Sequence, residues 1–195
     1  TAVNYEVGFK GMLTDSFSMS IALFNTEYDD LPYQVSTTSA GGFNTTNLVV
    51  AQTSRGIEWE STAYFSDNFK LHTSLGYIDV DVEKRSGVKP VAPLTPELTL
   101  SISPSYEFSL ADGAKIATRV DYSYRDEMFG EPSSDPGRLT QISSRALVNV
   151  DIAYTPSQGD WSLALYGYNI FDKRYDNARL NTGDYILQII SNDAS

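Results

Sequence analysis

Long segments in which apolar and polar residues alternate fill most of this chain, and they limit its possible folds more than any other feature. In the segment 55–65, Ile57 and Trp59 alternate with Glu58 and Glu60. Successive side chains of a β-strand point to opposite faces of the sheet, so a period of two predicts strands. The same pattern occurs in 4–13, 17–28, 69–82, 97–107, 114–125, 145–154 and 161–175, and 184–190 begins a possible ninth strand. Helical periodicity is nearly absent, so we predict an all-β fold.

The lengths of these segments and of the links between them favour a membrane barrel. The segments exceed the ~5–6 residues usual in soluble sheets and match the ~9–11 residues with which a tilted strand crosses a bilayer. Short links at 14–16, 66–68, 111–113 and 157–159 alternate with longer links at about 34–52, 83–95, 127–143 and 176–183. Outer-membrane barrels have short turns at one rim and long loops at the other. We therefore expect an antiparallel, up-and-down transmembrane β-barrel.

The two predicted faces of the strands support this expectation. Aromatic residues lie beside the short turns, as in an interfacial girdle; they are Phe17, Phe65, Phe69, Tyr106, Phe108, Tyr154 and Trp161. The charged residues fall together on the other face; they are Glu6, Lys10, Glu58, Glu60, His72, Arg119, Asp121 and Asp151. We expect lipid on the apolar face and a wet lumen on the charged one. A soluble β-sandwich would instead bury the apolar face under a second layer of protein.

Composition excludes several classes of function. The net charge is -11 and no stripe of Lys and Arg occurs, so we expect no nucleic-acid partner. The chain has no Cys, which excludes disulfides and thiolate metal sites. No apolar run reaches the ~18 residues of a membrane helix. The first residues, TAVNYEVGFKG, lack the features of a signal peptide, so an exported protein would have its signal upstream.

No catalytic group, metal site or cofactor is predicted. Glu58 and Glu60 could form a carboxylate pair, but we favour a polar lumen wall. The segment 79–83 lacks the Gly of a calcium loop. His72 is the only histidine, so we interpret it as a lumen residue and not as part of a triad.

Candidate ligand contacts come from the loops and the lumen. The loop at 41–47 is polar and carries an aromatic residue, and such loops on rigid scaffolds often bind ligands. Tyr166 and Tyr168 could stack on a ligand, although packing inside the lumen is the alternative we favour. Arginines such as Arg138 and Arg179 could engage an anionic ligand. The full candidate set is Tyr33, Phe43, Asn44, Asn47, Glu58, Glu60, His72, Arg138, Tyr166, Tyr168 and Arg179.

Three ordered motifs resemble the C-terminal barrel portion of TonB-dependent outer-membrane receptors. They are NYEVGFK at 4–10, GIEWE at 56–60 and NIFDKRY at 169–175. The resemblance implies a 22-stranded barrel, the size of plugged outer-membrane transporters, whose N-terminal plug is pulled by TonB to release a ligand. It further implies outer-membrane lipid and TonB as partners, and a ligand such as a ferric siderophore, haem, cobalamin or an oligosaccharide.

The sequence departs from that family because it shows no plug or TonB box and ends in SNDAS. We therefore expect residues 1–195 to supply about eight or nine strands of the larger barrel, with the plug absent from this chain. Iron import is the commonest activity of the family, so a ferric siderophore is the expected ligand, and enzymatic activity is not expected. The alternatives are a complete eight-stranded anchor or adhesion barrel, which the missing C-terminal aromatic strand disfavours, and a soluble β-sandwich binding module.

Overall fold

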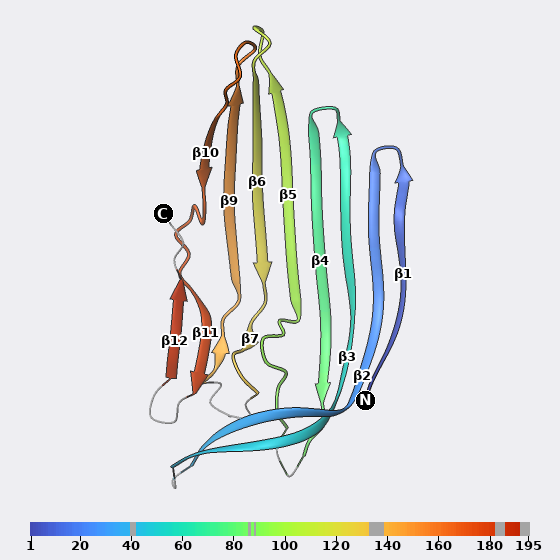
Figure 1. Cartoon of the computed structure of the whole chain (residues 1–195), viewed down its shortest axis with the longest axis vertical. Coiled ribbons are helices and arrows are strands. Elements are labelled where there is room, and N and C mark those ends of the chain that lie inside the picture. The colour runs from blue at the N-terminus through green and yellow to red at the C-terminus, as the bar shows by residue number, and fades with distance from the viewer. Residues whose placement is uncertain (40–41, 86, 88, 133–138, 182–185, 192–195) are drawn as a thin grey trace.

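A single antiparallel sheet dominates the computed structural model. The structure describes residues 1–39, 42–85, 87, 89–132, 139–181 and 186–191. For residues 36–39 and 42–43 it describes the backbone alone. Eight strands follow one another in the order β1-β2-β3-β4-β5-β6-β9-β10 (Figure 1). They are β1 (Ala2–Thr14), β2 (Phe17–Ser39), β3 (Gly42–Ser66), β4 (Phe69–Val82), β5 (Leu98–Ser109), β6 (Lys115–Arg125), β9 (Arg145–Thr155) and β10 (Leu163–Gly167). In the described residues β1 and β10 form opposite edges, so the sheet is an unclosed portion of a barrel. The predicted all-β, up-and-down fold is confirmed.

Two small sheets lie at the end of the large sheet opposite the short turns. One pairs β7 (Met128–Phe129) with β8 (Gln141–Ile142), and the other pairs β11 (Tyr175–Asn181) with β12 (Ile186–Ser191). The predicted long links at 127–143 and 176–183 were therefore wrong in part, because each contains strand. Among the described residues no helix is long and apolar enough to span a membrane.

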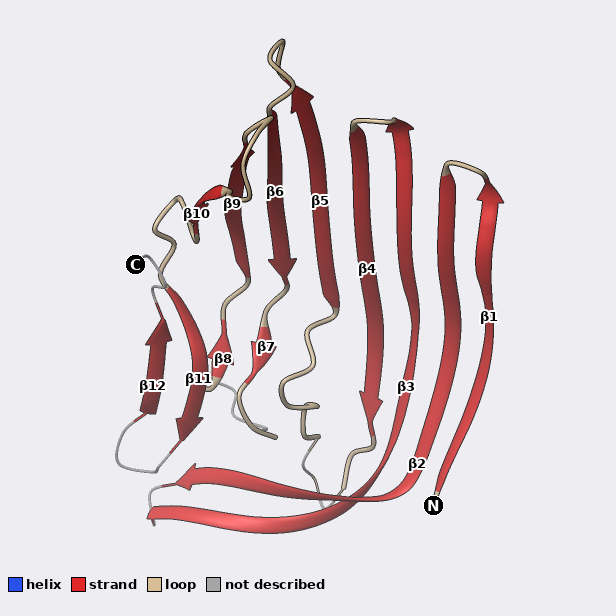
Figure 2. Ribbon diagram, turned by 45° about the horizontal axis from the view of Figure 1, so that its top comes forward, coloured by secondary structure: helices blue, strands red, loops and turns tan. Residues whose placement is uncertain are grey.

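The predicted link at 34–52 is wrong over the longest stretch of chain, because most of it is strand. There β2 and β3 continue as one hairpin, paired from Phe17 opposite Ala63 to Ser39 opposite Gly42, with one register shift between Tyr28 and Leu31. Beyond this shift the hairpin turns and runs across the end of the sheet (Figure 2). Its outer part is rich in Ser, Thr and Asn, so its strands lack the apolar alternation by which the membrane-type strands were recognised.

The predicted strand at 161–175 is also shorter than expected, because a turn ends β10 after Gly167. Asn169 and Asp172 adopt left-handed backbone conformations with φ of 46° and 49°, which Asn and Asp tolerate better than most residues. The Asn169 side chain is 4% exposed and bonds both backbone groups of Lys173, at 2.9 and 3.0 Å. Its backbone N–H donates to Asn149 at 2.8 Å, so the turn is fixed to the neighbouring strand β9.

Strand register separates an apolar face from a polar one. Trp59 lies opposite Ile21 on β2 and Leu75 on β4. Cross-strand partners share a face, so these residues form one apolar row. The apolar face is not covered by another layer within the described residues, and Val7 and Leu165 remain 68% and 69% exposed. A β-sandwich would bury these residues, so this face contradicts the sandwich alternative.

Aromatic rings gather at the end of the sheet that carries the short turns, as predicted. Phe65 stacks on Phe69 at 5.4 Å between ring centroids, and Tyr106 lies 6.3 Å from Phe69 and 4.5 Å from Phe108. A second pair follows along the same rim, with Tyr154 5.7 Å from Trp161. Amphipathic rings prefer the headgroup level of a bilayer, so this band fits an interfacial girdle.

The buried apolar cluster lies at the opposite end of the sheet, inside the bend of the β2–β3 hairpin. Its buried members are Tyr33, Val35, Leu48, Val50 and Val82, with Leu31, Val80 and Ala92 packed against them. The cluster joins the hairpin to the outer end of β4. The end of the sheet opposite the short turns, called the mouth below, is therefore packed like a small protein core. This packing holds the β2–β3 hairpin across the mouth.

Candidate functional site

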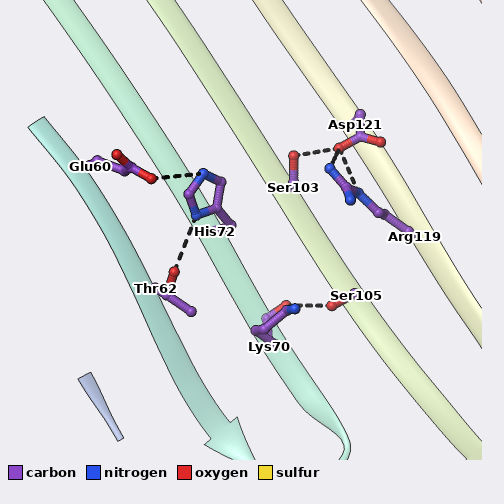
Figure 3. Close-up of polar contacts among 8 residues, drawn as sticks. All are labelled: Glu60, Thr62, Lys70, His72, Ser103, Ser105, Arg119 and Asp121. Atoms are coloured by element: carbon purple, nitrogen blue, oxygen red, sulfur yellow. Dashed lines mark hydrogen bonds and ion pairs between the residues drawn. The ribbon is translucent and has the colours of Figure 1, made fainter. Parts of the chain in front are cut away.

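The polar face of the sheet forms a wall of interacting side chains on β3 to β6 (Figure 3). The His72 imidazole lies 3.8 Å from the Glu60 carboxylate through Nε2 and 3.2 Å from the Thr62 hydroxyl through Nδ1. Asp121 on β6 accepts a hydrogen bond from Ser103 on β5 at 2.5 Å and forms an ion pair with Arg119 at 2.7 Å.

This wall has the character of a water-facing lining. The Glu60 side chain is 65% exposed and that of His72 is 36% exposed. Among the described residues, no group of three His, Cys, Asp or Glu side chains could hold a metal ion. Arg119 and Asp121 form an ion pair on this wall, and exposed charged and polar side chains of this kind suit the wet lumen expected from the sequence.

The polarity of both faces of β4 changes toward the end of the strand that lies opposite the short turns. On the polar face, Lys70, His72 and Ser74 give way to Ile78 and Val80 beyond Gly76. On the other face, Leu75 and Tyr77 give way to Asp79 and Asp81, which pair with Arg55 at 2.7 Å and Lys89 at 2.8 Å. The inner face of β4 is therefore apolar at this end of the strand.

The connection between β4 and β5 folds over this apolar surface. Leu94, with a left-handed φ of 52°, donates its backbone N–H to the Phe129 carbonyl at 2.7 Å, and Pro93 forms a parallel bridge with Phe129. Pro90 is fully buried, and Thr95 donates a hydrogen bond to the Pro93 carbonyl at 2.9 Å. The connection thus divides the mouth into two clefts with a common wall, formed by Ile78, Val80, Ala92 and Thr95.

The first cleft lies between this connection and residues 126–129, which follow β6 and include β7, and its volume is about 490 Å³. Its charged lining residues are Lys89, Glu97, Asp126 and Glu127. Asp126 accepts hydrogen bonds from the Tyr124 hydroxyl at 3.2 Å and from the backbone N–H of Glu127 at 2.8 Å. Three carboxylates against one ammonium make the lining of this cleft acidic.

The second cleft lies between the connection and the β2–β3 hairpin, and its volume is about 420 Å³. None of the described residues that line it is charged. The buried Tyr33 hydroxyl donates to Gln52 Oε1, and Gln52 Nε2 donates to Ser54 Oγ at 3.0 Å. Burial raises the pKa of Tyr33 above its ordinary value, so the phenol stays neutral. Both clefts fall in the size range of ligand pockets.

The residues predicted from the sequence do not form one site. Tyr33 lines the second cleft, Asn44 and Asn47 are exposed on the outer hairpin, and Glu58, Glu60 and His72 lie on the inner wall. Tyr166 and Tyr168 are exposed with parallel rings 6.5 Å apart, and Arg179 on β11 pairs with Asp176 at 2.7 Å. Arg138 and the Phe43 side chain lie outside the described residues. Their roles in ligand binding stay predictions.

Sequence reasoning missed Gln52, Ile78 and Val80 as parts of a cleft. A usable signal was present in the apolar inner positions at the end of β4. They are followed by a proline-rich link, PVAPLTP at 90–96, that could lie against them.

The sequence matches one family profile, described as TonB dependent receptor-like, beta-barrel, over residues 1–170. No curated protein matches the chain. Among solved structures, the ferric yersiniabactin uptake receptor FyuA from Yersinia pestis has a TM-score of 0.76 and 16% identity, covering 97% of this chain and 28% of its own. The ferric preacinetobactin receptor BauA from Acinetobacter baumannii has a TM-score of 0.71 and 16% identity, covering 98% and 28%.

The pyoverdine outer membrane receptor FpvA from Pseudomonas aeruginosa, bound to pyoverdine, also has a TM-score of 0.71, with 19% identity over 98% of this chain and 28% of its own. At such identities these likenesses concern the fold. The chain spans little more than a quarter of the length of these solved structures.

Proposed function

This chain belongs to the family of TonB-dependent receptor β-barrels, and from that premise we propose that it forms part of a bacterial outer-membrane receptor for a ferric siderophore. The family consists of outer-membrane proteins, and the similar structures named above are receptors for ferric yersiniabactin, ferric preacinetobactin and pyoverdine. The observation that carries the proposal is the pair of preformed clefts at the mouth of a sheet whose two faces suit two different solvents.

The geometry supports capture and passage of a ligand without covalent chemistry. The apolar face would lie against lipid, where Val7, Leu163 and Leu165 would exchange exposure to water for contact with acyl chains. The polar wall around Glu60 and His72 would face the aqueous lumen. The clefts would hold the ligand at the outer end of the strands, before it enters the lumen.

Energy coupling would come from parts of the receptor that this chain does not contain. We propose that residues 1–195 are the later part of a longer barrel, that a plug in the same receptor fills its lumen, and that TonB acts on the plug. In a bilayer both edge strands must find partners, because unsatisfied backbone groups in lipid cost several kcal/mol each. The open edges at β1 and β10 fit a wall that continues on either side.

Deletion of the full gene tests the proposal. We expect the deletion strain to grow poorly when iron is supplied only as a ferric siderophore and to lose uptake of radiolabelled iron from that complex. Growth on excess iron serves as the control. Full-length protein should restore uptake and should be recovered in the outer-membrane fraction. Unchanged uptake of every ferric siderophore in the deletion strain would refute the assignment.

A further inference from the structure

We propose that the second cleft binds an uncharged, hydrogen-bonding surface of its ligand, which favours neutral ferric tris-hydroxamates over anionic ferric tris-catecholates. This inference rests on the proposed function and adds the chemical class of the ligand. It depends on the charge and the hydrogen bonds of the cleft lining, and on the shape that the packed cluster gives to the cleft.

The cleft is preformed by packing. Tyr33 belongs to the buried apolar cluster, and Leu31, Val80 and Ala92 pack against that cluster while they also line the cleft. Three separate segments meet here: the β2–β3 hairpin, the outer end of β4, and the connection that follows β4. Because these walls are fixed by the same contacts that hold the hairpin, little conformational entropy is lost when a ligand enters.

The polar groups of the cleft are neutral and arranged in series. The Tyr33 hydroxyl donates to Gln52, Gln52 donates to Ser54, and the Ser54 hydroxyl keeps its own hydrogen to donate. Tyr28 adds a ring and a second hydroxyl to the lining. These groups can donate hydrogen bonds to carbonyl or hydroxamate oxygens along one side of a ligand.

Positive charge is directed away from this cleft. Arg55 lies on the opposite face of β3, where its guanidinium donates to Asp79 through Nε and Nη2 at 2.9 and 2.7 Å. Lys89 lines the neighbouring cleft and pairs with Asp81 at 2.8 Å. An anionic ligand would therefore leave water without gaining a cation from the described lining of the second cleft, and it would approach the carboxylates of the first.

This arrangement distinguishes two kinds of ferric complex. Three hydroxamate groups neutralise the charge of ferric iron, whereas three catecholates leave a trianionic complex. A desolvated anion is costly unless it is paired and hydrogen-bonded. Neutral hydroxamate and amide oxygens, in contrast, match the hydroxyl donors of Ser54 and Tyr28.

The test measures binding of both classes to purified full-length receptor in detergent, using a cyclic and a linear ferric tris-hydroxamate and two trianionic ferric tris-catecholates. We expect the neutral complexes to bind at least tenfold more tightly. Gln52→Lys places a cation in the cleft and should reduce this preference at least tenfold. Gln34→Lys is the matched control, because Gln34 is exposed on the same hairpin outside the cleft lining, and it should leave the preference unchanged.

Equal or tighter binding of the tris-catecholates to the wild-type receptor would overturn the inference, as would binding of neither class by a receptor whose deletion abolishes siderophore uptake. In both cases the proposed function would survive, because it rests on the uptake phenotype. An absent uptake phenotype would refute the function itself. If the Gln52→Lys variant does not fold, Thr26→Lys introduces the same charge into the same lining.

Discussion

Arginine substitutions at two adjacent positions of β4 test the assignment of lipid and water to the two faces. Leu75 is the seventh of the 14 residues of Phe69–Val82 and lies between Trp59 and Leu100 on the apolar face. Ser74 lies on the polar face, between Glu60 and Ser101. An Arg on the lipid face costs about 2–4 kcal/mol near the bilayer midplane, so Leu75→Arg should raise the unfolding equilibrium constant of the receptor in lipid by roughly 30- to 1000-fold.

Ser74→Arg should cost far less, because its guanidinium would reach lumen water and the nearby Glu60 carboxylate. The assay is guanidinium unfolding of full-length receptor reconstituted in phospholipid vesicles, followed by tryptophan fluorescence and by loss of heat-modifiable migration in gels. Both variants add the same side chain at nearly the same depth, so their difference isolates the face. A cost for Ser74→Arg that equals or exceeds that of Leu75→Arg would refute the two-solvent assignment.

Three further predictions use the same unfolding assay. Asn169→Ala should destabilise the receptor by about 1–3 kcal/mol, since it removes the two buried hydrogen bonds between the Asn169 side chain and the Lys173 backbone and retains a positive φ. Asn169→Gly should recover the part due to φ, and equal losses in both would contradict this. Gly56→Ala should be strongly destabilising, because the new Cβ would lie 2.3 Å from the Tyr77 carbonyl oxygen. Gly11→Ala is the control, because its Cβ would meet only the movable Phe9 ring, 3.2 Å away. Equal tolerance of the two substitutions would be inconsistent with the close approach of β3 and β4 at Gly56. Burial raises the pKa of Tyr33 above 10.0, so the contribution of this phenol to stability should be complete below pH 10.0. It should be lost as the pH rises through the higher pKa of the folded state. Tyr33→Phe should remove this alkaline loss of stability, and an unchanged loss would assign it to other groups.

The strands could be predicted wherever one face is apolar and the other polar, as expected of a wall between lipid and water. The predicted segment 69–82 coincides with β4, and 114–125 differs from β6 by one residue. Period-two alternation is strong there because the partition of side chains between two solvents is repeated at every residue pair. Segments 17–28 and 55–65 also lie on real strands, but they recover only the membrane-type parts of β2 and β3.

The outer hairpin could not be predicted by the same reasoning, because its distal part is not placed between two solvents. Asn44, Thr45, Thr46 and Asn47 are all exposed in β3, so no alternation records their strand conformation. Backbone hydrogen bonds hold this part as a ladder whatever its side chains are. Tyr33 lines a cleft, and the prediction that it contacts a ligand remains to be tested by binding.

The clefts depend on contacts between residues distant in sequence. The bond from Leu94 to Phe129 and the packing of Ala92 against Val80 place the β4–β5 connection over the sheet. Prolines at 90 and 93 indicate a restricted chain, but they do not specify what it covers. Local patterns thus predicted the wall, and tertiary packing determined the shape of its mouth.

Both faces of the β3–β4 pair change polarity at the same level, where the membrane-type wall ends and the mouth begins. Ile57 lies opposite Tyr77 on the apolar face, and the next rung of that face is the ion pair of Arg55 with Asp79. A charged pair exposed on the lipid side is unfavourable in hydrocarbon, so this rung lies outside the acyl region. At the same level the inner positions become apolar, starting with Ile78. Once the strands leave the bilayer, their outer face meets water and their inner face can be buried by the connection that follows β4. Under the proposed function, recognition would take place where the sheet stops serving as a membrane wall, because there the described residues enclose apolar surface.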